Sequence, residues 1–211
     1  FGFTPMALDR EALRALAGVL EDGRAWRVLE LGGGTSTVFW EGLAALADAD
    51  IEVTTLEHDP VWFNTLQDIL LSPRIRLSRQ RLRRIDDTVR ERMFAAPDHA
   101  MALWSRSGEW VPEREYHHFT IRNAFYGDLD RIPAAPGAWQ ALVLDGPHGN
   151  GRSLAFPLLA DRLTPDAFVL VDDFDHYPFL DDLGRIFRFR ELCRATGTKR
   201  WVLLQLQGRT P

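Results

Sequence analysis

The hydrophobic and polar positions of this chain follow two periods, one typical of helices and the other typical of strands. Apolar runs predict strands at six places: residues 27–31, 51–58, 74–78, 140–145, 167–173 and 199–206. Helical spacing is found at residues 9–20, after residue 34 (where Phe39, Leu43 and Leu46 share a face), and at residues 60–71, 153–163 and 179–192. Asp9 is placed to cap the first of these helices, and Pro60 is placed to open the third.

Strands that alternate with helices predict an α/β fold with a mostly parallel central sheet flanked by helices. An irregular segment, about residues 80–139, separates the third and fourth strands. It is too long for a simple connection, so we interpret it as an insertion or lid. No repeat or linker divides the rest, and we expect a single domain over residues 1–211.

Three consecutive glycines, Gly32–Gly34, follow the first strand and precede a helix that begins near Thr35 and Ser36. Glycine adopts backbone angles that other residues avoid and lets a ligand approach the backbone. Ligands of open α/β sheets bind beyond the carboxyl ends of strands, where a helix N-terminus offers unpaired N–H groups. The next strand ends at Glu57 and His58, and a carboxylate there can accept hydrogen bonds from ribose hydroxyls. The pattern predicts a site for an adenosine-containing cofactor.

The run VLELGGGTST, residues 28–37, resembles motif I of class I S-adenosylmethionine-dependent methyltransferases. Glu30, Gly32 and Gly34 occupy its defining positions, and Glu57, 27 residues after Glu30, matches the ribose-binding acid of the family. The resemblance implies a Rossmann-like class I methyltransferase fold that binds S-adenosylmethionine through Glu30, Gly32, Gly33, Gly34, Thr35, Ser36, Glu57 and His58. The dinucleotide fingerprint fits less well, because Thr37 stands where its third glycine is required.

One family feature is missing, the acid after the third strand that often contacts adenine. The chain has no carboxylate there until Asp86, which leaves Ser78, Gln80, or backbone and apolar contacts for that role.

Acidic residues also end the fourth and fifth strands, at Asp145 and at Asp172 and Asp173. Carboxylates that converge on one cavity raise one another's pKa unless a hard cation such as Mg²⁺ lies between them. These three positions resemble the ligand positions of metal-dependent O-methyltransferases of the catechol and caffeoyl-CoA type. That resemblance also implies His148 as a general base, since an unperturbed histidine has a pKa of about 6.5.

A second interpretation of the same residues needs no metal. Strand-end aspartates often stabilise turns, and successive residues of a strand point to opposite faces, which would separate Asp172 from Asp173. The segment DGPHGNGR, residues 145–152, also resembles other methyltransferase groups in which residue identity assigns no metal. Both interpretations remain open at this point, and Asp175 and His176 are further candidates in the same loop.

The insertion and the segment that precedes it are rich in arginines and ring-bearing side chains. Residues 74–92 hold eight arginines against three acids, which predicts either a solvated, salt-bridged face or attraction of an anionic acceptor. The rings either line an acceptor pocket or form a small separate core. They are Trp104, Trp110, Tyr116, His117, His118, Phe119 and Tyr126.

Composition narrows the classes of function. A formal net charge of -5 argues against a general nucleic-acid or anionic-membrane binder. The single cysteine, Cys193, excludes an internal disulfide and favours a reducing, cytoplasmic environment. No apolar run approaches the ~20 residues of a membrane span.

These observations predict a cytoplasmic S-adenosylmethionine-dependent methyltransferase that methylates an oxygen of a small molecule, with Asp145 and His148 as catalytic residues. Two other classes stay open. An NAD(P)-dependent oxidoreductase would share the glycine turn and Glu57. A methyltransferase-like binding module would keep the fold without turnover.

Overall fold

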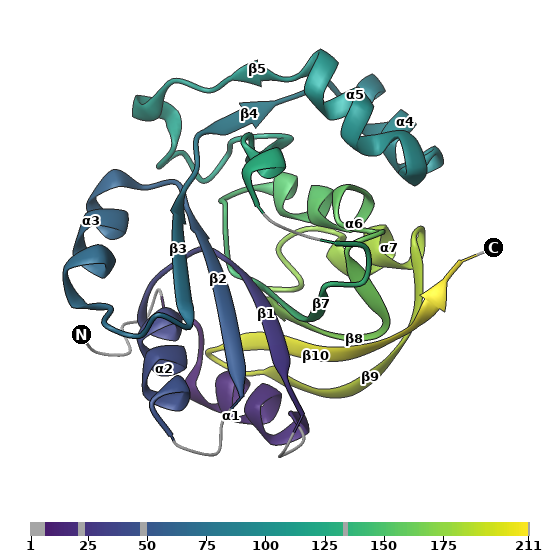
Figure 1. Ribbon diagram of the computed structural model, residues 1–211. Helices are drawn as coiled ribbons and strands as arrows, with labels where there is room; N and C mark the ends of the chain where they lie inside the picture. Colours follow the sequence, from purple (N-terminus) through teal and green to yellow (C-terminus); the bar gives the residue numbers. More distant parts are fainter. Residues whose placement is uncertain (1–6, 21–23, 47–49, 133–134, 211) are drawn as a thin grey trace.

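A central sheet organises the protein, whose computed structural model describes residues 7–20, 24–46, 50–132 and 135–210. In these ranges seven strands pair in the order β3-β2-β1-β7-β8-β10-β9 (Figure 1). Neighbours from β3 to β8 are parallel, and β10 is antiparallel to β8 and β9. The strands are β1 (Trp26–Leu31), β2 (Ile51–Glu57), β3 (Ile75–Arg79), β7 (Trp139–Leu144), β8 (Leu163–Asp172), β9 (Phe187–Thr196) and β10 (Arg200–Arg209). The predicted α/β class with a mostly parallel sheet is confirmed.

The strand order reverses at β1, which lies between β2 and β7. Leu31 pairs with Leu56 of β2 and with Leu144 of β7, so the three strands end at a similar level. The turns after Leu31 and Leu144 therefore meet at one edge of the sheet, where ligands bind in open α/β folds.

Separate hydrophobic cores cover the two faces of the sheet. Helices α1 (Arg10–Val19) and α2 (Thr35–Ala44) pack on the face that carries Val28. The other face, which carries Leu29, packs against α6 (Ala155–Leu158), α7 (Phe179–Gly184) and residues of the insertion. Helix α3 (Pro60–Ile69) follows β2 and begins with a proline, as predicted.

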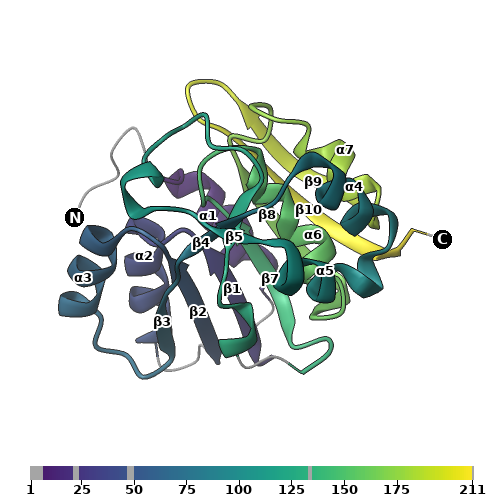
Figure 2. The ribbon, with the colours of Figure 1, turned by 90° about the horizontal axis from the view of Figure 1, so that it is seen from above.

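The segment between β3 and β7 is folded rather than irregular. It contains α4 (Asp87–Ala95), α5 (Ala100–Ser107) and an antiparallel sheet of β4 (Leu82–Arg84), β5 (Glu109–Trp110) and β6 (Ala124–Tyr126). This insertion lies at the end of the sheet where β3 leaves it, as Figures 1 and 2 show from two directions. Phe94, Trp104 and Phe125 belong to the core of the second face, so the insertion is also a covering layer of the sheet.

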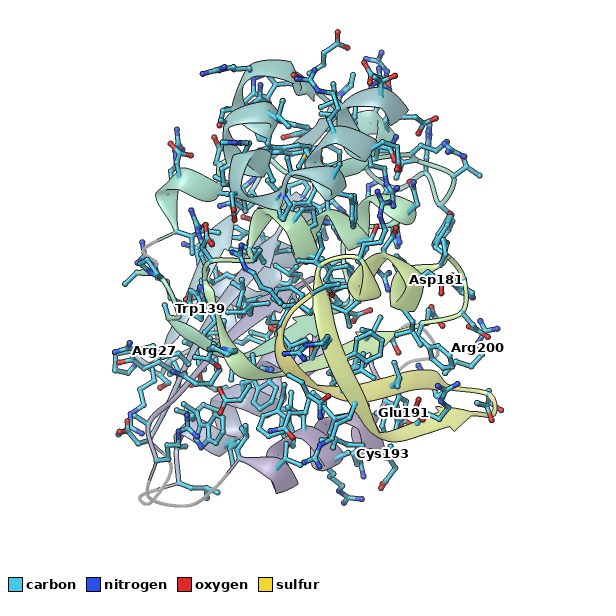
Figure 3. The ribbon with its side chains drawn as sticks, turned by 90° about the vertical axis from the view of Figure 1, so that its right-hand side faces the viewer. Arg27, Trp139, Asp181, Glu191, Cys193 and Arg200 are labelled. Atoms are coloured by element: carbon cyan, nitrogen blue, oxygen red, sulfur yellow. The ribbon has the colours of Figure 1, made fainter. Side chains whose placement is uncertain are left out.

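Two predicted helices are wrong in extent. Residues predicted as a helix at 179–192 form the short α7 and then strand β9, which pairs with β10 and carries the exposed Cys193 (Figure 3). Phe and Arg alternate from Phe187 to Arg190, and hydrogen bonding to β10 outweighs the helical spacing that precedes them. The predicted helix at 153–163 is a 3₁₀ turn, Asn150–Leu154, followed by the short α6. All residues of both pieces except Asn150 are buried, so no exposed polar face marks a helix in the sequence.

The predicted cap of the first helix is confirmed, whereas the predicted apolar face of the second is only partly right. Asp9 caps α1, because its carboxylate accepts a hydrogen bond from the Glu11 N–H at 3.3 Å. In α2 the most buried apolar residues are Trp40 and Ala44, the predicted Phe39 and Leu43 pack against the same core while partly buried, and Leu46, beyond the end of the helix, is exposed. No helix in the described ranges has the length and apolar character that crossing a membrane requires.

Candidate functional site

The turn after β1 is held in place by glycines that have no room for a side chain. Gly32 has φ of +95°, and a Cβ atom there would lie 2.7 Å from the backbone nitrogen of Gly146, in the turn after β7. Gly146 is equally confined, since its Cβ would lie 2.9 Å from the Gly32 Cα. The two turns therefore pack backbone against backbone, which brings the cofactor motif beside the DGP segment.

Gly34 differs from its neighbours because it faces empty space. A Cβ atom at Gly34 would meet no heavy atom within 4 Å, and the residue sits at the N-cap of α2. Its N–H donates to the Thr37 hydroxyl at 3.1 Å. The start of α2 thus opens onto a cavity, where backbone N–H groups and the positive end of the helix favour an anionic group such as a carboxylate.

Glu30 lies behind this turn and not in the cavity. Its carboxylate is fully buried and accepts hydrogen bonds from the hydroxyls of Thr37 and Thr55, at 2.6 and 2.7 Å, and from the indole N–H of Trp40 at 3.0 Å. Burial raises the pKa of Glu30 to about 7 despite these donors. The predicted cofactor contact of Glu30 is therefore corrected to a link between β1, β2 and α2.

Ser36 belongs to the same buried cluster and is corrected in the same way. Its side chain is 2% exposed and interacts with the Glu30 carboxylate, which lowers the pKa of that carboxyl slightly against the larger effect of burial. Neither side chain can reach a ligand at the turn, although both determine where α2 starts.

Glu57 anchors the other side of the turn. Its carboxylate accepts the Gly33 N–H at 2.7 Å and the Asp59 N–H at 2.6 Å, and the His58 Nδ1 atom lies 3.2 Å away. Only 3% of Glu57 is exposed, yet the residue lines the cavity. A carboxylate has about four acceptor positions, so two remain for hydroxyl groups of a ligand.

Together these elements enclose a first cavity of about 480 Å³, within the usual range for small-ligand sites. It brings together six of the eight residues predicted to bind the cofactor: Gly32, Gly33, Gly34, Thr35, Glu57 and His58. The sequence interpretation missed Ala7, Leu8, Asp59 and Trp62, and it assigned His117 to a possible acceptor pocket or a separate core instead of to this cavity. Of these, Asp59 and Trp62 carried a signal, because they follow Glu57 directly at the start of α3.

A second cavity, of about 560 Å³, adjoins the first, and both are lined by Asp145 and His148. Its walls include three aromatic rings, Phe119, Tyr177 and Phe179. The remaining lining residues are Gly149, Arg152, Asp172, Asp173, His176, Thr198 and Lys199. Two cavities that share a wall suit a reaction between two bound molecules.

The carboxyl groups of Asp145 and Asp172 lie within hydrogen-bonding reach of each other at this shared wall. Burial is the main cause that raises the pKa of both groups, and that of Asp172 reaches about 8. The buried guanidinium of Arg152 opposes this rise. Arg152 also donates to the Pro147 carbonyl at 3.1 Å and to the Asp172 carbonyl at 3.0 Å. It therefore ties the turns after β7 and β8 together, a role that the sequence interpretation missed although the DGPHGNGR segment contains it.

The predicted metal site is not formed. Asp172 is the last residue of β8, and Asp173 has φ of +49°, which turns its carboxylate toward Arg200 and His176, at 3.6 and 3.5 Å. Among the described residues no three histidine, cysteine or acidic side chains converge on a point where a metal could bind. Asp145, Asp172 and Asp173 all line the second cavity, but the described residues do not support the prediction that they hold Mg²⁺.

Neither residue proposed for adenine reaches the first cavity. The Gln80 amide donates to the Ser78 hydroxyl at 3.0 Å and accepts the Asp128 N–H at 3.1 Å, and Gln80 is 2% exposed. Both side chains hold the start of the insertion against β3.

The insertion's rings and arginines divide between core and site. Trp104, Tyr116 and Tyr126 are buried, whereas His117 lines the first cavity and Phe119 the second. The arginines of residues 74–92 line neither cavity, and several pair with acids: Arg79 with Glu113, Arg84 with Glu115 and Arg90 with Asp182. Their placement favours the salt-bridged face over attraction of an anionic acceptor.

His148 is neutral at physiological pH in this setting. Burial, together with smaller contributions from the nearby His58 and Arg152, lowers its pKa to about 4, so the expected pKa near 6.5 is corrected. The Phe119 ring packs against it with centroids 4.6 Å apart.

We expect NMR to detect this neutral state directly. The imidazole ¹⁵N shifts of His148 should stay constant from pH 8 down to about 5 and change only near 4. Because the unfolded state binds a proton near pH 6.5, this residue should lower stability as the pH falls from 6.5 toward 4. The spectrum of a His148→Gln variant identifies the resonances, and a midpoint near 6.5 would contradict the buried placement.

Comparison with known proteins finds similarity in structure alone. No protein-family profile and no curated protein matches the sequence. The structure is similar to a precorrin-6y C5,15-methyltransferase of Geobacter metallireducens, with a TM-score of 0.53 and 12% identity over 95% of this chain and 90% of that one. It is also similar to a proposed rRNA methylase of Clostridium thermocellum (TM-score 0.50, 12% identity, 93% and 95% covered). A third match is a proposed spermidine synthase of Corynebacterium glutamicum (TM-score 0.51, 13% identity, 96% and 66% covered).

Proposed function

We propose that this chain, which has the fold of class I S-adenosylmethionine-dependent methyltransferases, binds S-adenosylmethionine in the first cavity and transfers its methyl group to a small molecule in the second. The observation that carries the proposal is the shared wall: Asp145 and His148 line both cavities, at the strand order reversal where the fold places its ligands.

The residues of the first cavity fit such a cofactor. Gly34 leaves space where any side chain would project, and the first turn of α2 offers backbone N–H groups to a carboxylate. Glu57 lines the cavity with acceptor positions for ribose hydroxyls. S-adenosylmethionine, when bound, would supply an electrophilic methyl group on its sulfonium.

The protein's part in the reaction is to align and desolvate the acceptor. Three aromatic rings give the second cavity apolar walls, and positioning of two reactants can contribute roughly 7–11 kcal/mol to the lowering of the barrier. A neutral His148 can accept a hydrogen bond from an acceptor hydroxyl and take its proton. Asp145, with its raised pKa, is a second proton acceptor at the same wall.

An oxygen of a small molecule is the acceptor that this arrangement supports best. The second cavity has the volume of a small-ligand site, and the two candidate proton acceptors, Asp145 and His148, line both cavities. The chain's net charge of -5 and the pairing of Arg79 and Arg84 with acids favour a small molecule over a nucleic acid as the acceptor.

A binding and transfer experiment tests the proposal. S-adenosylhomocysteine should bind by calorimetry, and labelled S-adenosylmethionine should methylate at least one member of a panel of phenols and other small hydroxyl compounds. A Glu57→Gln variant should bind S-adenosylhomocysteine at least about tenfold more weakly. Its single amide oxygen would have to accept hydrogen bonds both from the ligand and from the two backbone N–H groups that Glu57 now binds. Glu52→Gln, on the exposed side of the same strand, is the matched control and should bind normally.

The rival classes give different results in the same experiment. Binding of NADH without S-adenosylhomocysteine would replace the proposal by an oxidoreductase. Binding of S-adenosylhomocysteine without transfer to any acceptor would support a non-catalytic module.

A further inference from the structure

The arrangement of the two cavities determines which end of the first cavity would hold the base of the cofactor. The reacting end must face the second cavity, at Asp145 and His148. Glu57, which would bind the ribose, lies at the end of β2, and strand β1 separates β2 from β7. Asp59 and Trp62 line the cavity from the start of α3, which follows β2, and His117 lies 3.4 Å from Asp59, so we place the nucleobase beside these three residues.

Asp59 is held in a single orientation by the helix that it caps. One carboxylate oxygen, Oδ1, accepts the backbone N–H groups of Val61 and Trp62 at 2.7 and 3.0 Å. The other oxygen, Oδ2, lies 3.4 Å from the Nδ1 atom of His117. Asp59 is 8% exposed, so this oxygen is available mainly to a molecule inside the cavity.

Trp62 and His117 complete this end from two different parts of the chain. Trp62 is in the first turn of α3, lines the cavity and is 47% exposed. His117 belongs to the insertion, from the segment that also places Phe119 in the second cavity. A ring, a carboxylate and an imidazole around one pocket suit a flat base with an exocyclic amine.

We propose that Asp59, Trp62 and His117 form the adenine subsite, in which Asp59 Oδ2 accepts a hydrogen bond from the exocyclic amine and Trp62 contacts the face of the base. This inference rests on the proposed function. It gives the insertion a part in cofactor recognition, because His117 faces Asp59 across the pocket. It also replaces Ser78 and Gln80, whose side chains are engaged with each other and with Asp128.

The experiment compares two ligands that differ only at the edge of the base that Asp59 would recognise. S-inosylhomocysteine carries a carbonyl in place of the adenine amine of S-adenosylhomocysteine, and its neighbouring N1 atom carries a hydrogen. The wild-type protein should bind the adenosine compound about tenfold or more tightly, since the carbonyl would face a carboxylate oxygen that can only accept. Affinities are measured by calorimetry on the full chain.

An Asp59→Asn variant should remove or reverse this preference while leaving the fold intact. Asparagine is an equally good helix cap, so its oxygen keeps the Val61 and Trp62 N–H groups and its NH₂ group takes the place of Oδ2. A donor there favours the inosine carbonyl. Asp68→Asn, on the exposed side of the same helix, is the control and should keep the wild-type ratio of affinities.

Substitutions of Trp62 and His117 test the other two side chains of the subsite. Trp62→Ala should weaken both ligands by a similar factor, about tenfold or more, and Trp62→Phe should restore most of the loss. His117→Asn should narrow the ratio of the two affinities, whereas His118→Asn, outside both cavities, should not.

The outcomes distinguish this inference from the function on which it rests. If S-adenosylhomocysteine binds but the wild type does not discriminate, or Asp59→Asn keeps the full preference, the adenine assignment is overturned and the cofactor proposal stands. If neither nucleoside binds to the wild type, the cofactor proposal is overturned and the adenine subsite with it.

Discussion

A Gly34→Leu variant should retain its fold and lose affinity for S-adenosylhomocysteine by about 100-fold or more, because the new side chain would occupy the space beside the start of α2. Gly34 has φ of 170°, an extended conformation that any residue adopts, and no heavy atom lies within 4 Å of its Cβ position. The substitution therefore adds no strain to the empty protein. Calorimetry measures the affinity, and thermal unfolding confirms that the fold is retained.

Two other glycines serve as comparisons for this result. Gly42 lies on the exposed side of the same helix and has equally open surroundings, so a Gly42→Leu variant should bind S-adenosylhomocysteine normally. Gly32→Ala should instead destabilise the protein, because its Cβ would collide with the backbone of Gly146 and its φ is positive. Normal ligand binding by Gly34→Leu would mean that the cofactor lies elsewhere.

The second large effect concerns the pH dependence of stability and is centred on Glu30. Its pKa rises from 4.5 to about 7 on folding, so the folded state holds a proton more tightly than the unfolded chain does. The stabilisation that Glu30 gives the folded state is therefore complete below pH 4.5 and is lost as the pH rises through about 7. The loss corresponds to about 3 kcal/mol of the free energy of unfolding.

A Glu30→Gln variant should remove this pH dependence. Glutamine has a similar shape and can accept from Trp40 through its oxygen while its NH₂ group donates to the Thr37 and Thr55 hydroxyls. Urea unfolding at pH values from 4.5 to 7.5 should show that the wild type loses stability relative to the variant as the pH rises. Glu41→Gln, in α2, is the control, and parallel curves for Glu30→Gln and the wild type would contradict the buried environment of Glu30.

The sequence predicted the framework of the first cavity because its signals are local. The glycines after β1, the acid at the end of β2 and the proline that opens α3 each depend on a few neighbouring residues. The structure confirms the α/β fold and brings Gly32–Gly34 and Glu57 to one cavity. The direction of Glu30 was also readable, since it shares a face of β1 with Val28, which packs toward α2, and not with Leu29.

The residues that the sequence misplaced depend on distant partners. Asp172 and Asp173 are adjacent, yet a positive φ at Asp173 sends their carboxylates to different neighbours. Strand β9 exists because β10 pairs with it, and its residues alone fit a helix equally well. His117 meets Asp59 only because the insertion folds back over the end of β2, a contact that spans 58 positions of sequence and has no local signal.

The hydrophobic contacts of the insertion limit how this protein can change its specificity. Replacing the whole segment by one from another enzyme would expose Leu29, Leu142 and their apolar neighbours to solvent. Single substitutions near positions 117–119, where the chain lines both cavities, should therefore be the route to new acceptors or cofactors. Replacement of the whole segment should instead yield insoluble protein.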